Sequence, residues 1–196
     1  MTRPLLILAS TSRYRRELLE RLRLPFDVVS PDVNETALPG EAPAPLAERL
    51  ALAKAHAVAA LHPGAVVIGS DQVCALDGQA LGKPGDHDRA TRQLRLLSGQ
   101  AAVFHTAVSV VQASTGFEQS ALAAVRVRFR ELSDQDIDRY LHLDQPYDCA
   151  GSAKCETLGI TLLEAIESDD PTALIGLPLI HTARLLRQAG IDPLAP

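Results

Sequence analysis

The stretch LLILASTSRYRRELLERL (residues 5–22) decides the fold class. It opens with a short apolar run, residues 5–9, which is typical of a fully buried strand. The hydroxyl-rich segment Ser10-Thr11-Ser12 ends this run, and from residue 13 the leucines share one face of a helix while the charges lie elsewhere. A strand, a polar turn and a helix in this order are the start of an α/β arrangement.

The same alternation continues along the chain. Further predicted helices cover about 46–61, 86–97, 179–188 and a segment opened by Ser133; further strands cover 26–29, 65–76, 102–111, 121–129 and about 161–166. The proline-rich stretch 32–45 and the polar stretch 148–156 are predicted loops, and Asp77-Gly78 predicts a hairpin. We therefore expect one α/β domain over residues 1–196, with a mixed, twisted sheet and flanking helices.

Composition narrows the class of protein. Apolar residues make up 46% of 196 residues, as in ordinary globular proteins. The net charge of −5 argues against a general nucleic-acid binder but not against a small nucleotide in a locally basic pocket. The three cysteines lack metal-ligand spacing and suggest reduced thiols. Because the first apolar run is too short for a signal peptide or a membrane span, we expect a cytoplasmic protein without a membrane segment.

The turn after the first strand is a candidate anion site. The start of a helix presents free N–H groups and a positive partial charge, and Ser12 is placed to cap it. Arg15 and Arg16 add guanidinium groups suited to phosphate oxygens, and cations in a first helical turn are unfavourable unless an anion is bound. The alternative is that Ser12 only caps the helix and the arginines are solvated.

Asp71 is a candidate catalytic or metal-binding carboxylate. It directly follows the buried run 65–69, and we expect it at the carboxyl end of a strand, where open α/β sheets bind their ligands. A carboxylate there can hold a divalent cation or take a proton from water. A surface aspartate at the start of a hairpin is the alternative.

Other polar residues give weaker signals. Lys54 falls on the apolar face of its predicted helix, where a lysine usually extends its ammonium to water. Lys83 stands between Gly82 and Pro84, which fix the backbone around one cation, and Glu35 is a loop acid. The six histidines have no ligand spacing, and we interpret all of them as structural or surface residues. Serine-hydrolase, Walker A and dinucleotide-binding motifs are lacking.

Several short motifs follow one another along nearly the whole chain: Leu8 to Ser12 with Arg15 and Arg16, Glu35, Lys54-Ala55, Gly69-Ser70-Asp71-Gln72, Gly82-Lys83-Pro84, Cys149-Ala150-Gly151-Ser152 and Gly176-Leu177-Pro178. Taken together and in this order, they resemble the motif set of the Maf family of nucleotide pyrophosphatases. The resemblance implies an elongated, two-lobed fold with a central cleft, related to inosine triphosphate pyrophosphatases, a divalent cation (Mg or Mn), and a homodimer.

The resemblance also implies roles for these residues. Asp71 matches the proton acceptor, and the other matching polar site positions are Ser12, Arg15, Glu35, Lys54 and Lys83. A metal held by Glu35 and Asp71 would neutralise phosphate charge, while the cations stabilise charge on the departing pyrophosphate. If Asp71 ligates the metal directly it would be a poor base, and the sequence leaves both roles open.

Three further positions address which nucleotide is hydrolysed. Tyr14, Gln72 and Glu156 differ from the residues at these positions in members that act on dTTP and UTP. They resemble the residues of the subgroup that hydrolyses 7-methyl-GTP. The methylated guanine is cationic, so an aromatic face attracts it, and the Glu156 carboxylate can accept from its N1–H and 2-amino group. Tyr14 stands where this subgroup more often has Trp. The alternatives are packing and loop roles for these residues, a different nucleotide substrate, or a regulatory binding protein linked to septum formation.

Overall fold

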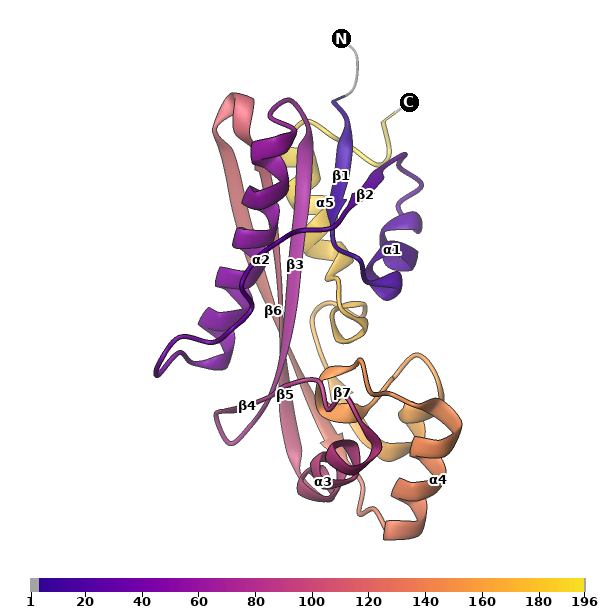
Figure 1. Cartoon of the computed structure of the whole chain (residues 1–196). Coiled ribbons are helices and arrows are strands. Elements are labelled where there is room, and N and C mark those ends of the chain that lie inside the picture. Colours follow the sequence, from indigo (N-terminus) through magenta and orange to yellow (C-terminus); the bar gives the residue numbers. More distant parts are fainter. Residues whose placement is uncertain (1–3, 196) are drawn as a thin grey trace.

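The computed structural model describes residues 4–195 and is built on one mixed sheet that runs the length of an elongated molecule (Figure 1). Over these residues the sheet has seven strands in the order β2-β1-β3-β5-β6-β7, with β4 paired to β3. The strands are β1 (Leu6–Ala9), β2 (Asp27–Val29), β3 (Val66–Leu76), β4 (Gln79–Leu81), β5 (Ala101–Gln112), β6 (Phe117–Phe129) and β7 (Leu163–Glu167).

Helices surround both ends of this sheet. Figure 1 shows α1, α2 and α5 around the end that carries β1 and β2, and α3 and α4 around the opposite end. This arrangement confirms the predicted α/β class and the elongated form. No helix within residues 4–195 has the length and apolar character needed to cross a membrane. The α-helices are α1 (Arg13–Glu20), α2 (Pro43–Leu61), α3 (His87–Leu97), α4 (Asp134–Asp144) and α5 (Leu179–Gln188).

Each end of the molecule has its own apolar core. Leu8 and Ile68 of the sheet pack with Leu185 of α5 at one end. At the other end, Leu94 of α3 packs with Phe104 of β5. The long strand β5 contributes to both cores, which joins the two ends into one sheet.

A change of strand pairing opens one edge of β3 in the middle of the sheet. β1 runs parallel to β3 and ends where Ala9 pairs with Gly69. On the same side of β3, the antiparallel β4 begins only where Leu81 pairs with Cys74. Residues 70–73 therefore have a strand neighbour only on the β5 side. Asp71 lies in this gap, next to the point where the parallel pairing stops.

The predicted place of Asp71 in its strand is wrong. It lies within β3 rather than at the strand's carboxyl end, because antiparallel pairing with β5 holds the strand straight on through residues 67–75. Two boundaries also differ. α2 begins at Pro43, since proline is well suited to the first helical turn, and β7 begins at Leu163 after a 3₁₀ segment, Leu158–Leu162.

Several local predictions are confirmed. Asp77 and Gly78 have positive φ values of 49° and 77°, as the tight hairpin turn requires. Ser133 and Asp136 form a reciprocal capping box at the start of α4. α5 covers residues 179–188, as predicted.

Candidate active site

A pocket of about 450 Å³ lies where the turn between β1 and α1 meets α2 and the open edge of β3. The loop after β4, the segment 148–156 and the 3₁₀ turn η4 (Ala173–Ile175) complete its wall. Eight of the ten side chains predicted from the sequence line this pocket: Ser12, Tyr14, Arg15, Glu35, Lys54, Gln72, Lys83 and Glu156.

The amino end of α1 faces the pocket. The Ser12 side chain caps the helix and accepts a hydrogen bond from the Arg15 backbone N–H at 3.4 Å. The first turn carries no acidic residue, so no side chain of that turn offsets its positive partial charge. Ser10 and Thr11 also line the pocket at this turn. Helix amino termini arranged in this way can bind an anion.

The two predicted phosphate-binding arginines point in different directions. The Arg15 guanidinium turns inward, where Nε donates to the Gly176 carbonyl at 3.0 Å and Nη1 to Ser10 Oγ at 3.4 Å. Arg16 lies outside the pocket on the exposed face of α1 and pairs with Glu20 at 3.0 Å. Successive helical residues are about 100° apart, and this rotation carries Arg16 from the pocket side to the exposed face of α1. The structure does not place Arg16 at the predicted phosphate site.

Arg15 is held in an environment rich in charge. Burial lowers the pKa of its guanidinium, and the negative charges of Asp71 and Glu35 oppose that effect. An arginine side chain stays protonated in proteins. Arg15 is therefore a fixed cation facing the acidic side of the pocket.

Lys54 joins two carboxylates across the interior wall of the pocket. Its Nζ lies 2.6 Å from Asp71 Oδ1 and 2.7 Å from Glu35 Oε1. The lysine is 5% exposed, so the expectation that its ammonium reaches water is wrong. Two carboxylate partners compensate the cost of burying this charge. Asp71 is itself buried and lies behind Lys54, so it does not line the pocket.

Glu35 is the exposed member of this group. Its side chain is 55% exposed, compared with 11% for Asp71. Partial burial raises the pKa of Glu35, but the hydrogen bond and charge of Lys54, with the charges of Lys83 and Arg15, outweigh it and hold the pKa below its ordinary value. Glu35 is therefore ionised at neutral pH and faces three cations.

The close approach of α2 to β3 allows Lys54 to reach Asp71. A Cβ atom at Gly69 would lie 2.2 Å from the Ala51 carbonyl oxygen and 2.6 Å from the Ala55 nitrogen. Only glycine permits this packing, and Lys54 stands between these two alanines on the helix. The glycine of the Gly69-Ser70-Asp71-Gln72 segment thus positions the ammonium on the carboxylate two residues later.

Tyr14 lines the pocket near the loop that carries Asp148 and Cys149. Arg13 donates from Nη2 to the Tyr14 hydroxyl at 2.8 Å, and its guanidinium carbon lies 4.7 Å from the ring centroid. Burial raises the pKa of Tyr14, and the Arg13 hydrogen bond opposes this. One face of the ring is thus in contact with a cation.

Gln72 is tied to the turn that closes the pocket. Its amide nitrogen donates to Thr106 Oγ1 at 3.0 Å and to the carbonyl oxygens of Ala173 and Leu174 at 2.9 and 3.0 Å. These bonds fix the amide plane and leave its carbonyl oxygen as the end available to a ligand. The neighbouring Ser70 hydroxyl donates to the carbonyls of Ala107 and Gly176 at 2.8 and 3.1 Å.

The remaining predicted residues come from two loops. Lys83 is exposed and, within residues 4–195, makes no hydrogen bond or ion pair, which leaves its ammonium available to a ligand. Glu156 is also exposed and accepts a long contact of 3.6 Å from Cys155 Sγ. Lys154 braces this second loop from within by donating to the carbonyls of Asp144 and Gln145 at 3.0 and 3.2 Å.

Arg13, Asp148 and Cys149 are among the pocket residues to which the sequence interpretation gave no role in the site. Burial raises the pKa of the Cys149 thiol to about 12, so it lines the pocket as a neutral group rather than as a nucleophile. Asp148 and Cys149 lie in the segment recognised as a polar loop, and Arg13 adjoins Tyr14. Their place in a pocket depends on folding, and no local pattern marks it.

A family model for Maf-like proteins matches residues 5–189. The chain belongs to this family. Several relatives of this chain are named 7-methyl-GTP pyrophosphatase. One from Polaromonas sp. strain JS666 is 65% identical over 97% of this chain and 86% of the relative. Another, from Albidiferax ferrireducens, is 61% identical over 96% of this chain and 95% of the relative. A third, from Bordetella pertussis, is 60% identical over 97% of this chain and 95% of the relative.

Proposed function

We propose that this chain hydrolyses 7-methyl-GTP to 7-methyl-GMP and pyrophosphate. The observation that carries this proposal is the set of groups that meet in one pocket. The amino end of α1 and the cations Arg15, Lys54 and Lys83 line it together with the Tyr14 ring and the Glu156 carboxylate. A nucleoside triphosphate has an anionic tail and a planar base, which these groups suit. The shared name of the close relatives supports the same substrate.

The triphosphate is bound by Arg15, Lys54 and Lys83. Arg15 is fixed by hydrogen bonds to Gly176 and Ser10, so it offers a preorganised positive charge. Lys83, which makes no ion pair with a described residue, meets the phosphate charge from the loop after β4. These cations stabilise the charge that develops on the departing pyrophosphate.

Glu35 and Asp71 suit a hard divalent cation such as Mg²⁺ or Mn²⁺. Their donors are carboxylate oxygens only, and both converge on the same point, Lys54 Nζ, at 2.7 and 2.6 Å. Such cations are commonly bound by one or two carboxylates together with phosphate oxygens. When bound, the cation would neutralise phosphate charge. Glu35, the more exposed of the two, is the ligand that we propose, and Asp71 would be a second ligand only if it were not the proton acceptor.

Asp71 is the proposed proton acceptor for the attacking water. Its Oδ1 lies 2.6 Å from Lys54 Nζ. Phosphate oxygens compete for the same ammonium, and when Lys54 turns to them the Asp71 carboxylate is released. It then takes a proton as the water oxygen bonds to the α-phosphorus and the bond to pyrophosphate breaks. Lys54 thereby couples substrate binding to the freeing of the base.

The base is recognised by Tyr14, Gln72 and Glu156. A methylated guanine is cationic and stacks favourably on an aromatic face. Glu156 accepts from the adjacent N1–H and 2-amino donors, and Gln72 presents its fixed carbonyl oxygen. Because Arg13 already contacts one face of Tyr14, the base uses the other face or displaces the guanidinium.

The deciding experiment is a substrate panel with purified protein, with and without Mg²⁺. We expect metal-dependent release of pyrophosphate and monophosphate, with 7-methyl-GTP preferred over GTP, dTTP and UTP. Preference for dTTP or UTP would overturn the assigned substrate, and absence of pyrophosphate release would overturn the reaction. Glu156→Gln is the matched variant, since it keeps the shape and removes the charge; it should lower kcat/KM for 7-methyl-GTP more than for UTP.

The proposal extends to the setting of the enzyme. Free nucleotides are its substrates, and the net charge of −5 suits a protein that does not bind nucleic acid. We place it in the cytoplasm, where such nucleotides are made and used, and infer a homodimer by analogy with the family. Light scattering of the purified protein tests the dimer, and a mass of one chain would exclude it.

A further inference from the structure

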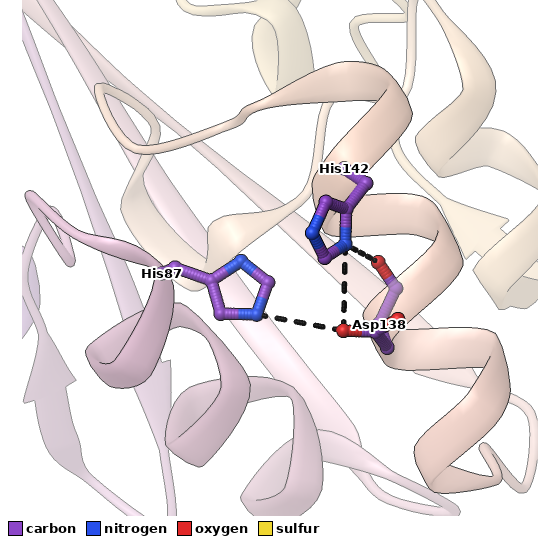
Figure 2. Close-up of side chains that lie close together, drawn as sticks. All are labelled: His87, Asp138 and His142. Atoms are coloured by element: carbon purple, nitrogen blue, oxygen red, sulfur yellow. Dashed lines mark hydrogen bonds and ion pairs between the residues drawn. The ribbon is translucent and has the colours of Figure 1, made fainter.

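A second cluster of potential ligands lies outside the pocket, between α3 and α4 (Figure 2). His87 is the first residue of α3, while Asp138 and His142 stand one turn apart on α4. His87 Nε2 lies 3.7 Å from Asp138 Oδ1, and His142 Nδ1 lies 3.4 Å from the same oxygen. One ligand atom of each side chain lies within 4.8 Å of the other two.

We propose that His87, Asp138 and His142 bind a divalent transition-metal ion of the zinc type. Two imidazoles and a carboxylate are common ligands of Zn²⁺. In a tetrahedral site with bonds of about 2.1 Å, neighbouring ligand atoms are roughly 3.4 Å apart. The two distances to Asp138 Oδ1, 3.4 and 3.7 Å, fit this spacing with small side-chain movements. Asp138 and His142 are more than half exposed and have room for such movements.

The hydrogen bonds of His87 favour the tautomer that a metal needs. Its Nδ1 lies 3.2 Å from the Tyr147 hydroxyl, which itself donates to the Leu141 carbonyl at 3.3 Å. The hydroxyl proton is used in that bond, so the hydroxyl accepts from His87 and the imidazole proton lies on Nδ1. The Nε2 lone pair then faces the Asp138 carboxylate. A bound cation would bring these two facing acceptors, His87 Nε2 and the Asp138 carboxylate, together. The hydrogen bond from His87 Nδ1 to Tyr147 would orient the ring, as such bonds do for metal-bound histidines.

His142 completes the set with a simple proton rearrangement. Its Nδ1 lies 2.9 Å from the Asp138 backbone carbonyl oxygen, to which it donates when protonated there. The ring is exposed, so solvent can move this proton to Nε2 and free the Nδ1 lone pair for the metal. This site differs in kind from the Glu35 and Asp71 carboxylates, because imidazole favours transition metals over Mg²⁺.

An ion here would stiffen two walls of the pocket. His87 follows Lys83 by four residues, and Tyr147 directly precedes Asp148, which lines the pocket. The Gly85 N–H donates to the Tyr147 carbonyl at 3.0 Å, which already links the two segments. The sequence interpretation of these histidines as structural or surface residues overlooked the cluster, because His87 and His142 meet only through the packing of α3 on α4.

The test uses the full chain, stripped of metal and titrated with Zn²⁺ in excess Mg²⁺ against a chromogenic chelator. We expect one equivalent of Zn²⁺ to bind. His142→Ala and Asp138→Asn should weaken binding at least tenfold, and Tyr147→Phe about tenfold through loss of the orienting bond. His56→Ala is the matched control, because His56 pairs with Glu118 at 2.7 Å and is not part of the cluster; it should bind as the wild type does.

A second readout does not depend on variants. Imidazole ¹⁵N signals of the wild-type protein should shift on addition of one equivalent of Zn²⁺ at His87 and His142 and stay unchanged at His56. Weakened zinc binding in the cluster variants together with these shifts supports the site. Unshifted signals at both cluster histidines, or zinc binding by His142→Ala equal to that of the wild type, refutes it.

Discussion

Replacing Gly69 with alanine tests whether the contact between α2 and β3 sets the geometry of the active site. The new Cβ would lie 2.2 Å from the Ala51 carbonyl oxygen and 2.6 Å from the Ala55 nitrogen. Both are backbone atoms of a helix and cannot rotate away. Since ordinary contact begins at 3.4 Å, α2 and β3 must separate by about 1.2 Å locally.

This separation has two measurable costs. Overpacking of a filled interior costs about 1–3 kcal/mol of the free energy of unfolding. The bond from Lys54 to Asp71, 2.6 Å in the native protein, would lengthen toward about 3.8 Å if the lysine moved with its helix. A misplacement of about 1 Å in an active site costs on the order of 100-fold in rate. We expect kcat/KM to fall by about that factor, and more than the loss of stability alone explains.

Urea unfolding gives the change in the free energy of unfolding. Pyrophosphate release by the folded protein gives the change in kcat/KM. Gly64→Ala is the matched control, because a Cβ there meets no atom within 4 Å. Its free energy of unfolding should stay within roughly 0.5 kcal/mol of the wild type, as for most surface substitutions. If Gly69→Ala matched this control in both stability and activity, the packing argument for Lys54 would be refuted.

Three further predictions concern single residues. Asp71→Asn should remove most turnover in the pyrophosphate assay, and activity within tenfold of the wild type would exclude Asp71 as proton acceptor. Arg15→Ala should lower kcat/KM strongly while Arg16→Ala stays within about twofold, since Arg16 pairs with Glu20 away from the pocket; equal losses would contradict this placement. The pKa of Glu35 is lower in the folded protein than in the unfolded chain, where it has its ordinary value. The pairing of Glu35 with Lys54 therefore stabilises the fold fully when the pH is above the unfolded-state pKa. This stability is lost as the pH falls through the folded-state pKa. Unfolding by urea across the acid range should therefore be less pH-dependent in Glu35→Gln, and identical pH profiles would exclude the pairing as a source of stability.

The elements that the sequence predicted well are those fixed by neighbouring residues. The Asp77-Gly78 turn needs two positive φ values, which these residues accept, and Ser133 caps α4 through a residue three positions away. The apolar run before Ser10 marks β1 for the same local reason. These requirements are met within a few residues, so the pattern and the structure agree.

Predictions failed where a distant partner decides the outcome. Lys54 was expected to reach water, but α2 lies on β3 and two carboxylates meet its ammonium. Asp71 was placed at a strand end, but pairing with β5 continues the strand past it. For Arg16 a local signal did exist, since Glu20 four residues later is the spacing of a helical ion pair on the exposed face.

By itself the sequence determined the α/β alternation, the helix amino terminus that faces the pocket, and the types of side chain available for phosphate, metal and base. Only the tertiary structure decided which of these side chains meet. The physical reason lies in the sheet: β1 ends opposite Gly69 and β4 starts opposite Cys74, so β3 is open between them at Asp71. Helix α2 packs against β3 at Gly69, and residues far apart in the chain then share one pocket.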